Sequence, residues 1–244
     1  MIRVVALLAV LFAAAPLRAA PIVVDLSEHL VAITAGFAGA EVLLFGAVDE
    51  PGDVVVIVRG PTRPMIMYRK SRHFGIWVNA DHMTFEDVPA YYAIASTRPL
   101  EEIAAPTVLA RNEMGVENLR LDLPRAKASP NVAQDWREAL IRNQQRAGLY
   151  PAEVGRVGFL GDRLFRARLA LPANVPTGTY EAKVYFLRDG QIVSAQTTPL
   201  FVSKVGLEAE IFDFAYDQSA LYGIIAILVA LMAGWLAHVA FRRA

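Results

Sequence analysis

The sequence contains no cysteine. This absence excludes disulfide bonds, thiolate nucleophiles and cysteine-based metal sites. Common catalytic motifs are missing too, because no H-E-x-x-H, G-x-S-x-G or S-x-x-K pattern and no glycine-rich phosphate loop occurs. The adjacent carboxylates at 86–87 and 101–102 are typical of a solvated surface rather than of an acid–base pair. We therefore predict a protein that is not an enzyme and that holds no cofactor.

An excess of positive charge is also missing. The formal net charge is zero, and all 24 acidic residues lie between Asp25 and Asp217. Only 20 of the 24 basic residues lie in that stretch, which therefore carries a net charge of −4. A net-acidic domain has no overall positive field to attract a polyanion, so the charge indicates no nucleic-acid partner.

One long hydrophobic run is present, over residues 221–241. Its 21 residues include no Asp, Glu, Lys or Arg. A helix of that length is about 30 Å long, which matches the hydrocarbon core of a bilayer. The alternative is a buried core helix of a soluble domain, but such helices need fewer consecutive apolar residues. We predict a transmembrane helix over residues 218–241.

The two ends of the chain predict its orientation. Residues 1–19 have the pattern of a secretory signal peptide, with Arg3 before a short apolar run and small residues at the expected cleavage site. An uncleaved N-terminal membrane anchor is the alternative. The C-terminal tail, residues 242–244, begins with Arg242 and Arg243. Positive residues stay on the cytoplasmic side, so the tail is expected inside and the preceding domain outside.

The region between these ends reads mainly as short strands. Turn residues separate the apolar, β-branched runs of residues 20–99 at short intervals, and strands resume over 151–206. Asp189-Gly190 is a strong signal for a two-residue hairpin turn. The pattern predicts a mainly β fold, with one or two immunoglobulin-like antiparallel sandwiches followed by a juxtamembrane linker at 207–217. The expected strands lie at 22–24, 30–33, 41–46, 54–58, 64–68, 74–78, 91–95, 164–171, 179–187 and 192–202.

Residues 100–150 form a helical insertion in this pattern. Ser129 is a suitable N-cap, Pro130 fits the first turn and Gly148 is placed to end the helix. Its apolar face includes Trp136 and Leu140 and predicts packing against the sandwich. The alternative is a helix that binds a partner.

Several short segments carry a resemblance to a known family. The chain resembles a family of transmembrane proteins from alphaproteobacteria that has no established activity. This resemblance implies an inner-membrane protein of Gram-negative bacteria with a periplasmic domain, associated with exporters of the sulfite/sulfonate type. The matching segments are 45–47, 58–61, 69–70, 75–79, 88–92, 148–150, 171–180 and 222–223.

The densest group of basic residues is a candidate anion-binding patch, because guanidinium groups bind oxyanions and carboxylates in a bidentate manner. Alternation along strands could instead scatter these side chains over two faces of an ordinary surface. A membrane-proximal patch that touches lipid phosphates is a third possibility. The candidate residues are Arg59, Arg63, Arg69, Lys70 and Arg72.

A weaker hypothesis is a copper site formed by Met65, Met67, His73 and His82. Thioethers suit Cu(I) and imidazoles suit copper in general. The alternative is that the methionines fill gaps in the core and the histidines lie at the surface.

Within the hydrophobic helix, Ala226, Ala230 and Gly234 recur every four residues. Small residues on one stripe allow a second membrane helix to approach closely. Together the patterns predict a membrane-anchored, non-enzymatic interaction module that assists an integral membrane partner. The alternatives are a periplasmic small-anion or copper-binding protein and, third, an enzyme with an unfamiliar site.

Overall fold

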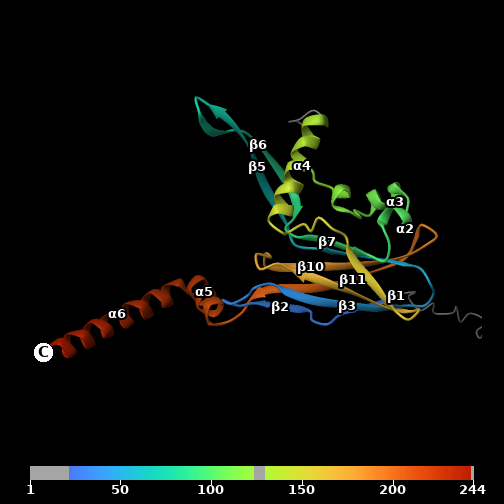
Figure 1. Cartoon of the computed structure of the whole chain (residues 1–244). Coiled ribbons are helices and arrows are strands. Elements are labelled where there is room, and N and C mark those ends of the chain that lie inside the picture. The colour runs from blue at the N-terminus through green and yellow to red at the C-terminus, as the bar shows by residue number, and fades with distance from the viewer. Residues whose placement is uncertain (1–21, 124–129, 243–244) are drawn as a thin grey trace, which may run out of the picture.

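The body of the protein is one curled sheet of nine strands (Figure 1). A computed structural model describes residues 22–123 and 130–242. The order of strands across the sheet is β1-β3-β9-β8-β7-β4-β10-β11-β2. These strands are β1 (Ile22–Leu26), β2 (Leu30–Ile33), β3 (Ala40–Val48), β4 (Asp53–Arg59), β7 (Tyr92–Ser96), β8 (Gly155–Leu160), β9 (Leu164–Leu171), β10 (Gly178–Arg188) and β11 (Gln191–Lys204).

The curled sheet confirms the predicted mainly β fold. Strands from the two predicted β regions alternate in it, since β3 pairs with β9 and β4 pairs with β10. The two regions therefore share one sheet. Two of its pairs, β7 with β8 and β11 with β2, are parallel. Parallel pairing is possible here because strands brought together from distant parts of the chain need no hairpin to join them.

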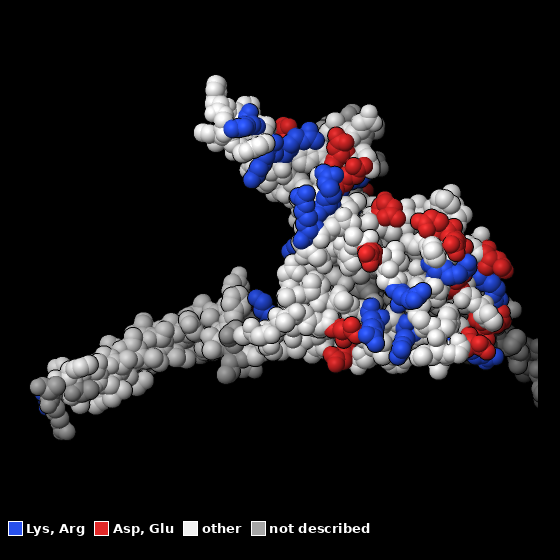
Figure 2. Space-filling model, in the orientation of Figure 1, with Lys and Arg blue, Asp and Glu red and all other residues white. Residues whose placement is uncertain are grey.

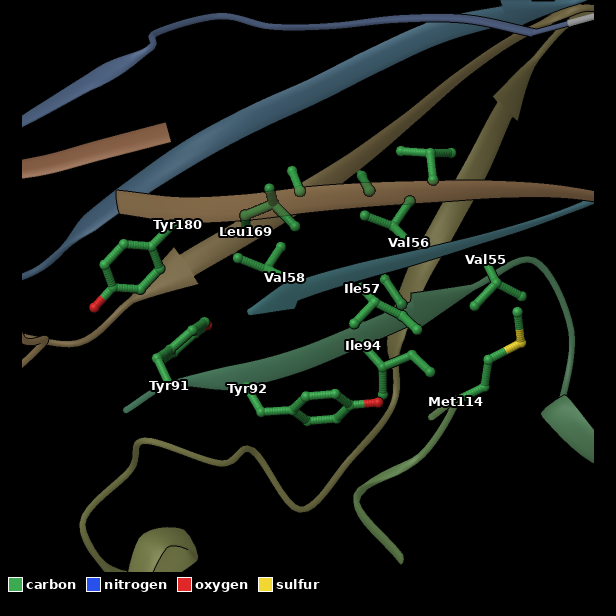
Figure 3. Close-up of a cluster of buried hydrophobic side chains, with 14 of the residues drawn as sticks. Val55, Val56, Ile57, Val58, Tyr91, Tyr92, Ile94, Met114, Leu169 and Tyr180 are labelled. Carbon is green, nitrogen blue, oxygen red and sulfur yellow. The ribbon is translucent and has the colours of Figure 1, made fainter. Parts of the chain in front are cut away.

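Strand β4 lies at the centre of the core. Its residues 54–58 are a continuous run of Val and Ile, and all five side chains are buried. Figure 3 shows Val56 and Val58 on one side of the strand and Val55 and Ile57 on the other. Short helical segments supply cover through Ile103 and Leu109, and the loop between two of them adds Met114. They are α2 (Leu100–Ile103), α3 (Pro106–Arg111) and the 3-10 turn η1 (Val116–Asn118).

Two sets of side-chain hydrogen bonds to backbone groups stabilise the sandwich. The Gln196 amide of β11 donates to the Val24 carbonyl of β1 (3.0 Å) and accepts from the Val24 amide (3.1 Å), so it bridges the two layers as a strand would. The Tyr180 hydroxyl donates to the Pro176 carbonyl at 2.6 Å. This is the bond made by the tyrosine corner of immunoglobulin-like sandwiches.

A two-stranded arm projects from the body (Figure 1). It consists of β5 (Thr62–His73) and β6 (Ile76–Pro89), which pair only with each other. The predicted strands 64–68 and 74–78 were therefore too short and wrongly assigned to the sandwich. Exposed, polar-rich strands of this length give no periodic burial signal in the sequence. Helix α4 (Pro130–Arg146) lies against the base of the arm.

The chain leaves the body through two helices. Helix α5 (Leu207–Asp217) replaces the predicted linker, and α6 (Ser219–Phe241) follows it. Residues Ser219–Val239 are long and apolar enough to cross a membrane, and none of that span is buried against the rest of the protein. The signal peptide predicted for residues 1–19, the N-cap at Ser129 and the end of the tail at 243–244 lie outside the described residues.

Candidate functional site

One face of the arm is covered by α4. The Met65 sulfur lies 3.6 Å from the Gln144 side-chain nitrogen, and the Met67 sulfur lies 3.7 Å from that of Asn143. Across the arm, Met67 is opposite Met83, which is buried. Because side chains alternate along a strand, the odd-numbered residues of β5 face α4.

Arg69 lies on the same side of β5 as Met65 and Met67, although it remains exposed. Its guanidinium lies 4.7 Å from the ring centre of Trp136 on α4, a favourable cation–π contact. Asp81 is directly opposite Arg69 in the strand register. Trp136 itself is buried, so α4 packs through its apolar face as the sequence predicted.

The opposite face of the arm is open, and we call it the free face. Ile66 and Tyr68 are each 54% exposed, and Trp77 is 65% exposed. Lys70 and Arg72 follow them on the same side of β5, and Trp77 is opposite Arg72 in the neighbouring strand. The free face consists of Ile66, Tyr68, Lys70, Arg72, Trp77, Asn79 and His82.

The tip of the arm is a two-residue turn, Phe74-Gly75. Both residues have positive φ, 50° at Phe74 and 86° at Gly75, as the tight turn of a hairpin requires. Gly75 meets this need at little cost, whereas a bulky side chain at positive φ is strained. Phe74 is also fully exposed, with Ile76 beside it 68% exposed. Phe74 therefore combines an unfavourable backbone conformation with an apolar ring that the described residues leave exposed.

The basic residues predicted as one patch are distributed over four places. Arg59 ends β4 in the body, Arg63 lies at the base of the arm and Arg69 faces α4. Only Lys70 and Arg72 share the free face. Alternation along the strand, one of the three interpretations of this group, thus separates Arg69 from Lys70 and Arg72.

The four candidate copper ligands also lie on different parts of the arm. Met65 and Met67 face α4, while His82 lies on the free face beside Tyr68, with ring centres 6.2 Å apart. His73 is next to the tip. Within residues 22–123 and 130–242, no group of three or more His, Asp or Glu side chains is placed to hold a metal ion.

Arg59 lines a polar cavity of about 280 Å³ on the body, with Arg111, Lys183 and Tyr185 among the other lining residues. Its guanidinium forms an ion pair with the carboxylate of Glu113. The Glu113 carboxylate also forms an ion pair with the Arg120 guanidinium, 3.6 Å away. The backbone of Glu113 has a positive φ of 54°. Sequence reasoning missed Glu113, because nothing in the sequence relates it to a residue 54 positions earlier.

Buried tyrosines hold this region to the arm. The Tyr92 hydroxyl donates to the Glu113 carbonyl (2.7 Å) and accepts from the Gly115 amide (2.9 Å). The Tyr150 hydroxyl donates to the Pro89 carbonyl at the end of β6 (2.6 Å). Burial raises the pKa of both hydroxyls, so both remain protonated donors at neutral pH.

On α6, the small residues Ala226, Ala230 and Gly234 are exposed. No heavy atom outside its own helix and chain neighbours lies within 4 Å of the position that a Cβ on Gly234 would take. The described part of the chain therefore leaves this stripe uncovered.

These features define a class: a β-sandwich protein with a projecting arm and one helix suited to a membrane. The chain belongs to the family described as "Putative transmembrane protein (Alph_Pro_TM)", whose family model matches residues 21–243. The match extends over the body, the arm and α6, and confirms the resemblance drawn from the sequence. No curated protein matches the chain.

Proposed function

We propose that this protein is a non-enzymatic accessory module anchored in the bacterial inner membrane. In this proposal α6 crosses the membrane once, the body and arm lie in the periplasm, and the tip of the arm docks on an integral membrane partner. The tip carries the proposal, because Phe74 is both strained and fully exposed. Burial against a partner would recover the free energy that this side chain costs the isolated protein.

The proposed orientation rests on the charges that flank α6. Arg242 follows the helix directly, and Asp217 precedes it. Basic residues next to a transmembrane helix favour the cytoplasmic side. The body precedes α6, so it is then on the periplasmic side.

For the partner we propose an exporter of the sulfite/sulfonate type, which the family resemblance implies. Such a partner would share the membrane with α6, where the stripe of Ala226, Ala230 and Gly234 permits close helix packing. The alternative functions have weaker support. Arg59 is paired with Glu113 rather than free for an anion, and Met65 and Met67 face α4 rather than the two histidines.

Site-specific photocrosslinking tests this function. A photoreactive benzoylphenylalanine replaces Phe74 in the full chain, which is then irradiated in native membranes. We expect a covalent adduct with an integral membrane protein, identifiable by mass spectrometry. The same group at Gln191 is the control, because that residue starts β11 beside the β10–β11 turn and is exposed. Equal crosslinking at both positions, or no protein adduct at Phe74, would contradict the docking role of the tip.

A further inference from the structure

We propose that the free face of the arm binds the anionic phospholipid headgroups of the bilayer that holds α6. The arm then lies along the membrane surface and directs its tip sideways. This inference rests on the proposed function only for the membrane anchoring. It concerns Lys70, Arg72, Tyr68 and Trp77 rather than the tip.

The free face has the residue types that recognise a membrane surface. Lys70 and Arg72 can each bind a lipid phosphate, the guanidinium in bidentate fashion. Tyr68 precedes Lys70 on this face and Trp77 is opposite Arg72, and both expose aromatic rings whose apolar bodies and polar tips suit the headgroup region. Ile66 adds apolar surface on the same side.

The distribution of acidic residues favours an anionic ligand at this face. From residue 66 to residue 82 the only acidic residue is Asp81, and it is opposite Arg69 on the face that α4 covers. Figure 2 shows the basic side chains gathered on the arm, whereas basic and acidic side chains are mixed over the body. A net-acidic protein thus presents a local cationic surface, and each such cation strengthens attraction to an anionic membrane by roughly fivefold.

The bilayer is the occupant that the chain itself supplies. Because α6 keeps the arm near the membrane, the effective concentration of headgroups is high and a weak contact suffices. In Figure 1 the arm and α6 both extend towards the left of the body, the arm upward and α6 downward. Only α5 and the residues around Gly206 (φ 120°) connect the body to α6, so a tilt about this connection brings the free face onto the bilayer.

The absence of cysteine makes a direct test possible. Asn79 lies opposite Lys70 on the free face and is exposed, so Asn79→Cys carries an environment-sensitive nitrobenzoxadiazole label without removing a proposed contact. The labelled full chain is reconstituted into two kinds of liposome, one of phosphatidylcholine alone and one that also contains about 30% phosphatidylglycerol as the anionic lipid. In the anionic liposomes we expect a blue-shifted emission and quenching by nitroxide lipids. A label at Gln191→Cys should stay in water.

Charge-matched variants decide the outcome. Lys70→Gln with Arg72→Gln should lower the affinity for anionic headgroups by about 25-fold, from two cations at roughly fivefold each. Arg163→Gln with Arg166→Gln, two exposed residues of the body, should leave it unchanged. The proposal is wrong if the label stays in water in both liposomes, if phosphatidylcholine alone gives the same signal, or if shielding occurs only in native membranes that contain other proteins. That last outcome would leave the docking function intact.

Discussion

At the scale of single residues, the tip of the arm combines two unfavourable features. Phe74 occupies a left-handed backbone conformation, which costs an ordinary L-residue roughly 1–2 kcal/mol. Its ring is also fully exposed. Asparagine tolerates this conformation better and precedes glycine in the most favoured hairpin turns.

Phe74→Asn should therefore make the tip more stable and less functional at once. We expect amide hydrogen exchange at His73 and Ile76, the pair that flanks the turn, to slow about two- to fivefold, corresponding to roughly 0.5–1 kcal/mol. The same variant should lose its partner in co-purification from membranes. Phe74→Leu is the control that keeps an apolar side chain, and faster exchange in Phe74→Asn would refute the strain argument.

Asp53 illustrates how one carboxylate contributes to stability in a pH-dependent way. It accepts hydrogen bonds from the Arg98 guanidinium and from the Thr97 hydroxyl, both at 2.9 Å. The bond from Arg98 lowers the pKa of Asp53 below its usual value. A carboxyl with a lowered folded-state pKa stabilises the fold above its unfolded pKa, near 3.9, and this contribution is lost as the pH falls through the folded pKa.

Asp53→Asn should lower the free energy of unfolding by about 1 kcal/mol at pH 7, a modest value because Arg98 is half exposed. The difference from wild type should be constant from about pH 7 to pH 5 and shrink towards zero below about pH 4. Urea titrations at several pH values measure it. Asp162→Asn, at an exposed position, serves as the control. A difference that grows on acidification would overturn the assignment.

At the scale of elements, a single side chain, Gln196, supplies hydrogen bonds to the edge of β1 that pairs with no strand. One edge of β1 pairs with β3, while the Gln196 amide satisfies the Val24 amide and carbonyl on the other. Val24 is buried, so water cannot easily replace these bonds. Leaving each of these two buried backbone groups unpaired costs about 1–3 kcal/mol.

Gln196→Ala should lower the free energy of unfolding by at least about 2 kcal/mol, from the two groups together. Hydrogen exchange at Val24 should become faster than in wild type. Gln191→Ala, in the same strand but exposed, should change neither quantity. If Gln196→Ala retained wild-type stability, the two layers would have to be closed by apolar packing alone.

At the scale of the whole molecule, α6 divides the chain into a folded body and a helix that no other described element covers. Alkaline phosphatase is active only outside the cytoplasm, so fusions report topology. A fusion after Ser203 should be active and one after Ala244 inactive, because the arginines after α6 favour the cytoplasmic side. Moving Arg242 and Arg243 to the other end of the helix should weaken this difference. The reverse pattern of activity would refute the periplasmic location.

The sequence by itself was sufficient for features that depend on local pattern. The apolar run of α6, the alternation of β9, the Asp189-Gly190 turn (φ 48° and 76°) and the apolar face of α4 with Trp136 were all predictable. Each of these features depends only on about one to two dozen consecutive residues, because helix and strand periodicity and turn geometry are local properties.

Only the tertiary structure decided which distant residues meet. The parallel pairing of β2 with β11, the Gln196 bridge to β1 and the Arg59–Glu113 ion pair join positions far apart in the chain, where no local pattern relates the partners. The same is true of the arm. Alternation places residues on two faces, but α4, about 65 residues later, determines that Arg69 contacts Trp136 while Lys70 and Arg72 lie on the face away from α4, because such contacts depend on what packs against a face.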